Sequence, residues 1–167
     1  MDKKGHAYIM ALGGILAALA VVIMCLGGLI PLATFICPLL CMLILSLFLQ
    51  HSSKRTAFTW YIVVALLSIL LGPDKEAAAV FAFLGYYPIL KPQFDRIKVH
   101  WLLKILYFNS SILLMYYLLL KLFRLEQVMQ DYEELGITMT VILLLLGNVT
   151  FVLLDKLLEK FCLKWKK

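Results

Sequence analysis

Apolar residues in this chain are gathered into long runs, which short polar breaks separate. A helix that crosses a bilayer needs about 20 predominantly apolar residues, within a range of about 17–25. The runs therefore predict an all-α fold, a polytopic membrane helix bundle that forms a single transmembrane domain over residues 1–167. About six transmembrane helices are expected, at residues 7–29, 32–50, 56–71, 76–90, 100–123 and 136–154.

The range 76–90 is the weakest of the six. About 15 residues at 1.5 Å each fall short of a bilayer core about 30 Å thick. Gly85 and Pro88 within it also indicate a kink or an early exit. Either this segment crosses with help from its neighbours, or it is re-entrant and the chain has five crossings.

The distribution of basic residues separates these two counts. If six helices cross and the N-terminus is cytoplasmic, all 16 lysines and arginines lie on the cytoplasmic side except Lys75, Lys121 and Arg124. This is the bias that the positive-inside rule describes. Five crossings would instead place the lysine-rich C-terminus outside. The charges therefore favour six helices in the cell membrane, with both termini cytoplasmic.

Composition strengthens the membrane assignment. The chain is 63% hydrophobic and 16% charged, whereas soluble domains are about 45–50% apolar and about 25% charged. The net charge of +6 comes from basic residues placed singly or in small groups between apolar runs. Such a pattern favours membrane lipid headgroups over nucleic acid as the partner.

The sequence lacks the motifs of common enzymes. It has no phosphate-binding glycine loop, no Gly-x-Ser-x-Gly and no His-Glu-x-x-His. No aspartate or glutamate lies in the middle of a predicted helix, where proton-coupled carriers place an ionisable group. The four cysteines have no histidine at metal-ligand spacing. We therefore expect no enzymatic activity, no cofactor and no metal site.

Four polar residues are candidates for substrate binding. Asn109 and Asn148 lie about halfway along two predicted helices, and Thr138 lies near Asn148 in the last one. They would either form interhelical hydrogen bonds, worth about 0.6 kcal/mol each on average, or line a solute cavity. Asp74, in the connection before residue 76, would either cap the next helix or contact a ligand.

Small residues form a stripe on the first predicted helix. Ala7, Ala11, Gly14 and Ala18 follow one another at intervals of four, three and four, so they share one helix face. Small side chains allow a second helix to approach closely. The second helix belongs either to this chain or to a partner subunit.

The first predicted helix also carries a resemblance to a known family. The sequence HAYIMALGGILAALA at residues 6–20, followed by GGLIP at 27–31, resembles the start of the substrate-binding S components of energy-coupling-factor (ECF) vitamin transporters. The resemblance implies a small six-helix protein with cytoplasmic termini, whose first helix docks on a transmembrane T subunit through an Ala-x-x-x-Ala motif. Ala7 and Ala11 match that motif, and Gly14 and Ala18 match it in an alternative register.

A second segment is similar to a motif of uncharacterised small membrane proteins from Gram-positive bacteria. It is LGYYPILKP at residues 84–92, and it implies no particular activity. The chain carries no vitamin-specific signature, so the substrate stays open.

Two functions are compatible with these observations. The first is a substrate-capturing membrane subunit of an ECF-type ABC transporter for a small metabolite or vitamin, with a T subunit and two ABC ATPases as partners. The second is a non-transporting scaffold or accessory subunit of a larger membrane complex. In the first case, the substrate cavity would open outward near Pro31, Asp74 and Thr138.

Overall fold

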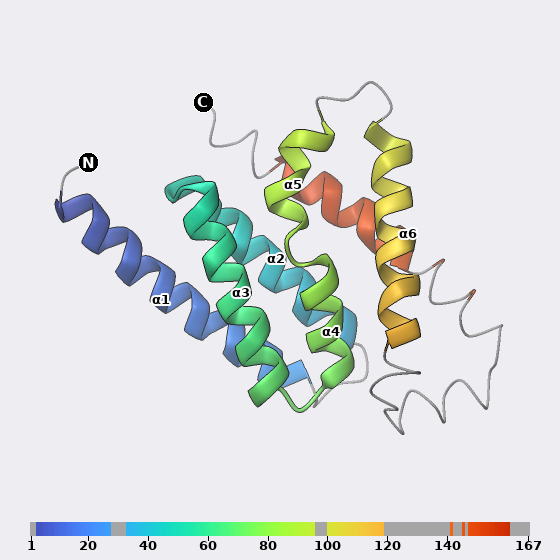
Figure 1. Ribbon diagram of the computed structural model, residues 1–167, viewed down its shortest axis with the longest axis horizontal. Coiled ribbons are helices and arrows are strands. Elements are labelled where there is room, and N and C mark those ends of the chain that lie inside the picture. The colour runs from blue at the N-terminus through green and yellow to red at the C-terminus, as the bar shows by residue number, and fades with distance from the viewer. Residues whose placement is uncertain are drawn as a thin grey trace. The chain divides into compact units, whose positions relative to one another are not determined.

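The computed structural model describes residues 3–27, 33–95, 100–118, 141, 145 and 147–160, and all regular secondary structure in these ranges is helical. The helices are α1 (Lys3–Leu26), α2 (Ala33–His51), α3 (Lys54–Leu71), α4 (Lys75–Leu84), α5 (Tyr87–Phe94) and α6 (His100–Leu118) (Figure 1). Residues 147–160 form a further helix, red in Figure 1, which we name the C-terminal helix. The predicted all-α class is confirmed for the described part of the chain.

Four of the described helices are long and apolar enough to cross a membrane. They comprise Ala7–Leu26, Thr34–His51, Lys54–Leu71 and Trp101–Leu118. These helices fall within or close to four of the six predicted ranges. The chain is thus compatible with a multi-pass membrane protein.

The predicted range 76–90 falls on two short helices instead of one. Helices α4 and α5 have 10 and 8 residues. Pro88 explains part of the break, since it has no N–H to donate to the carbonyl of Leu84, and its ring would clash with that carbonyl in a continuous helix. As the second residue of α5, Pro88 stands where no intrahelical donor is required.

A side chain from α3 holds the end of α4. The Tyr61 hydroxyl donates a hydrogen bond to the carbonyl of Ala82, one of the last four carbonyls of α4, which lack intrahelical partners. The Tyr61 ring also lies 5.7 Å from that of Phe81 and 5.8 Å from that of Tyr86, between centroids. The break is thus packed as well as hydrogen-bonded.

The last two predicted ranges are described in part. Helix α6 is described from His100 to Leu118, inside the range 100–123. The C-terminal helix continues to residue 160, beyond the predicted apolar boundary at 154, as a charged extension. Residues 119–140 lie outside the described residues.

The chain divides into two compact units, Met1–Gln93 and Phe94–Lys167. In the first unit, α2 packs against α1, α3 and α4. Helices α1, α2 and α3 meet at Gly13, which is buried. The Trp60 indole of α3 donates to the Gly13 carbonyl at 2.9 Å, and a Cβ at Gly13 would lie 3.0 Å from Cζ of Phe48 in α2. Glycine at this position lets the Phe48 ring reach the α1 backbone.

In the second unit, α6 packs against the C-terminal helix. The rings of Phe108 and Phe151 stack with centroids 4.7 Å apart. A Cβ at Gly147 would lie 2.9 Å from Cζ of Phe108, so glycine makes room for the ring there. Met115 and Leu158 are fully buried within this unit's core.

Candidate functional site

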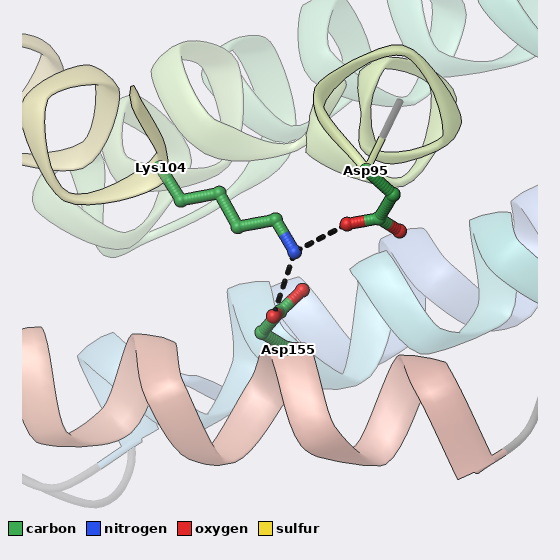
Figure 2. A network of polar contacts seen from close by, with 3 residues as sticks. All are labelled: Asp95, Lys104 and Asp155. Carbon is green, nitrogen blue, oxygen red and sulfur yellow. Dashed lines mark hydrogen bonds and ion pairs between the residues drawn. The ribbon is translucent and has the colours of Figure 1, made fainter. Parts of the chain in front are cut away.

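Three charged side chains meet within the second unit, as Figure 2 shows. Lys104 lies on α6, Asp155 lies on the C-terminal helix, and Asp95 directly follows the last residue of α5. The Lys104 Nζ atom is 2.6 Å from Oδ1 of Asp95 and 2.9 Å from Oδ2 of Asp155. We name this group the lysine–aspartate triad.

The lysine is the most deeply buried member of the triad. Its side chain is 7% exposed, compared with 19% for Asp155 and 43% for Asp95. A buried ammonium group is costly unless it is paired and hydrogen-bonded, and the two carboxylates provide acceptors for its N–H groups. With two aspartates for one lysine, the triad has a formal charge of −1.

The triad belongs to a layered interface between α6 and the C-terminal helix. Lys104 pairs with Asp155, Phe108 stacks on Phe151 four residues further along α6, and Asn109 pairs with Asn148. As the residue number increases along α6, the number of the contacting residue on the C-terminal helix decreases. The two helices are therefore antiparallel, and residues spaced by three or four form the contact on each.

A cavity of about 100 Å³ opens beside the triad. The side chains around it include Trp101, Lys104, Phe151, Asp155, Lys156 and Glu159. Trp101 and Lys104 are three residues apart on α6, and Phe151, Asp155 and Glu159 follow at intervals of four on the C-terminal helix. The cavity is thus built by one face of each helix.

Two of the predicted substrate-binding residues contact each other. Asn148 Nδ2 donates to Oδ1 of Asn109 at 3.0 Å, and Asn109 Nδ2 donates to Oδ1 of Asn148 at 3.3 Å. Asn109 Nδ2 also lies 2.9 Å from the carbonyl of Ile105. These contacts correspond to the interhelical hydrogen bonds expected as one of the two alternatives, while a solute-lining role stays a prediction.

Asp74, in the first unit, has both carboxylate oxygens in hydrogen bonds. Oδ1 accepts from the backbone N–H of Ala77 at 3.0 Å, which makes Asp74 the N-cap of α4. Oδ2 accepts from the Thr34 hydroxyl of α2 at 2.7 Å. The neighbouring Lys75 donates to the carbonyls of Ile69 and Gly72 at 2.7 and 2.9 Å, and so caps the end of α3. Thr138 lies outside the described residues.

The small-residue stripe of α1 faces away from the rest of the first unit. Ala7, Ala11, Gly14 and Ala18 are all exposed, and a Cβ at Gly14 would meet no atom within 4 Å. Gly13, its neighbour in sequence, is buried against Phe48. Helix α1 thus packs on its Gly13 face and leaves the stripe uncovered by the described residues.

The triad and its cavity were not predicted from the sequence, where Lys104 entered only as one of the cytoplasmic charges. A lysine within the otherwise apolar start of the range 100–123 was the available signal. Its partner Asp155 is 51 residues away, and sequence spacing does not show which acidic residue faces it. Among the described residues, no three His, Cys, Asp or Glu side chains gather as they would around a metal ion.

Comparison with known proteins gives no family assignment. No protein-family model, curated protein or solved structure matches this chain. The resemblance to ECF S components therefore rests on the residues of the first helix.

Proposed function

We propose that this protein is a substrate-capturing membrane subunit of an ECF-type ABC transporter for a small metabolite or vitamin. The observation that carries the proposal is the uncovered stripe of α1. Small residues are useful where helix backbones approach closely, and Ala7, Ala11, Gly14 and Ala18 serve no such contact among the described residues. A T subunit docked on this face would use them.

The proposal includes six crossings with both termini cytoplasmic. Helices α4 and α5 together provide the fourth crossing. Their 10 and 8 residues amount to about 27 Å of helix at 1.5 Å per residue, close to the 30 Å of a bilayer core. The backbone at the break is compatible with this depth because Tyr61 donates to the Ala82 carbonyl, and non-helical backbone in a membrane must be satisfied by protein.

The candidate substrate-binding residues of this proposal are Asp74, Asn109, Thr138 and Asn148. Asp74 already accepts hydrogen bonds from Thr34 and Ala77, so its contribution would be to fix the start of α4. A substrate would then contact neighbouring residues, or it would replace the hydrogen bond that Thr34 donates to Asp74.

Co-purification from native membranes tests the proposal. We expect the tagged chain to recover a T subunit and two ABC ATPases, and native mass spectrometry of the complex to reveal a bound metabolite. Recovery of a different stable assembly without ATPases would contradict the proposal and favour the scaffold or accessory subunit.

A further inference from the structure

The cavity beside the triad combines charges of both signs with an aromatic wall. Asp155 and Glu159 provide carboxylates, Lys104 and Lys156 provide ammonium groups, and Trp101 provides an indole. These four charges of the lining balance, and Asp95, which pairs with Lys104 but does not line the cavity, adds one negative charge nearby. The cavity therefore suits a ligand that carries both a cationic and an anionic group.

The charged side chains of the cavity differ in burial and form an inner, buried set and an outer, exposed set. Lys104 is buried and held by both aspartates at 2.6 and 2.9 Å. Glu159 and Lys156 are exposed, lie on the rim of the cavity and take no part in the triad. A ligand can therefore reach one carboxylate and one ammonium group on the rim without breaking the triad.

The size of the cavity limits what can enter. An apolar cavity of about 150 Å³ accommodates benzene, which has six heavy atoms. By the same scale, a cavity of about 100 Å³ accommodates about four heavy atoms. An aminoethyl ester group has this size. Its primary ammonium can donate charge-assisted hydrogen bonds to carboxylates and can lie against an aromatic face.

The surroundings of the cavity are those of a lipid-facing surface. Leu102 and Leu106 on α6 are 69% and 61% exposed, and Leu153 and Leu157 on the C-terminal helix are 56% and 45% exposed. Trp101 is the first residue of the stretch of α6 that is long and apolar enough to cross a membrane. Tryptophan at such a position is typical of the level of the lipid headgroups.

From these observations we infer that the cavity binds the headgroup of a phospholipid with a primary ammonium group, of the phosphatidylethanolamine type. The ammonium lies beside Glu159 and Asp155 and against Trp101, while the phosphate lies beside Lys156. The inference goes beyond the proposed transport function and does not depend on it. It requires only that α6 is embedded in a membrane.

Competition between two lipids tests the inference. The full chain, purified in detergent, is mixed with equal amounts of phosphatidylethanolamine and phosphatidylcholine that carry identical acyl chains, and the bound lipid is counted by native mass spectrometry. The headgroups differ only in three N-methyl groups, which remove every ammonium N–H. We expect about ten times more phosphatidylethanolamine than phosphatidylcholine to be bound, because the choline headgroup cannot donate the charge-assisted hydrogen bond.

Two variants at the rim of the cavity test the ammonium contact and the phosphate contact separately. Glu159→Gln should reduce the preference between the lipids, because it removes the carboxylate at the rim and leaves only Asp155, which already pairs with Lys104. Lys156→Gln should weaken the binding of both lipids and leave the ratio of bound ethanolamine lipid to bound choline lipid unchanged, because both lipids carry the phosphate. Lys160→Gln, on the same helix and also exposed but outside the cavity, is the matched control and should change neither the affinity nor the ratio. All three variants should unfold at the temperature of the parent chain.

Three outcomes would overturn the inference. One is equal retention of the two lipids, and another is a preference that Glu159→Gln leaves unchanged. The third is tight binding of soluble phosphoethanolamine without any lipid preference, which would assign the cavity to a free amine instead of a membrane lipid.

Discussion

At the scale of single residues, Lys104 has the most demanding environment in the described part of the second unit. Its ammonium group is withdrawn from water, and only the two aspartates make that burial tolerable. The same geometry makes each aspartate dependent on the lysine, because removal of one partner leaves uncompensated charge. The triad is therefore a point at which a single substitution has a large effect.

Replacing the lysine should destabilise the second unit. We expect Lys104→Met to cost about 3 kcal/mol, the lower end of what breaking a buried ion pair costs, since Asp95 is 43% exposed and water can reach it. Thermal unfolding in detergent measures the loss. The double variant Lys104→Met with Asp155→Asn should recover part of it, because it removes a stranded charge. A loss no greater than that of the exposed control Lys160→Met would contradict this account.

At the scale of helices, the asparagine pair should couple α6 to the C-terminal helix. Asn109→Leu leaves the Asn148 amide without its reciprocal partner, and interhelical hydrogen bonds in membranes contribute at most about 1.7 kcal/mol. We expect each single leucine variant to cost about 1 kcal/mol and the double variant to cost less than the sum. A double-mutant cycle on unfolding free energies measures the coupling, and strict additivity would show that the pair contributes nothing.

Helix α1 offers a matched comparison between its two faces. Ala11→Trp lies on the exposed stripe, so it should leave folding and ligand binding intact but abolish recovery of the partner subunits and uptake. Gly13→Leu lies against Phe48, where even a Cβ would be 3.0 Å from the ring, so overpacking should cost about 1–3 kcal/mol. Unfolding temperature and pull-down yield are measured for both. An Ala11→Trp chain with normal stability and normal partner recovery would contradict the docking role.

The helices were largely predictable because apolar run length alone identifies a membrane-length segment. For example, the predicted range 32–50 agrees with the observed helix Ala33–His51. The agreement is close because the polar residues Ser52 and Ser53 end the apolar run. At Gly85 and Pro88 the sequence predicts a kink or an early exit, and the structure has a break between two short helices. The hydrogen bond to the end of α4 comes from Tyr61 on another helix, which the segment's own sequence does not reveal. The triad was not predictable because helix packing brings Lys104 and Asp155 together. A single sequence does not show which residues of two helices come into contact.

At the scale of the whole molecule, the proposed arrangement depends on whether α4 and α5 together cross the membrane. If they do, the chain crosses six times and Lys75 lies on the side opposite to Arg96. If they do not, the two positions lie on the same side and the C-terminal lysines are outside, against the positive-inside bias. One measurement on each side of α4–α5 therefore decides the topology.

Single cysteines with a membrane-impermeant reagent provide that measurement. The four native cysteines are first replaced, and the replaced chain is checked for an unchanged unfolding temperature, because Cys37 and Cys41 are buried. Lys54→Cys, Arg96→Cys and Lys164→Cys should be labelled only after the membrane is opened, and Lys75→Cys and Glu133→Cys should be labelled in intact cells. Labelling of the Lys75 and Arg96 positions from the same side would refute six crossings. It would also place the C-terminal helix, and the headgroup cavity beside Lys104, against the outer leaflet instead of the inner one.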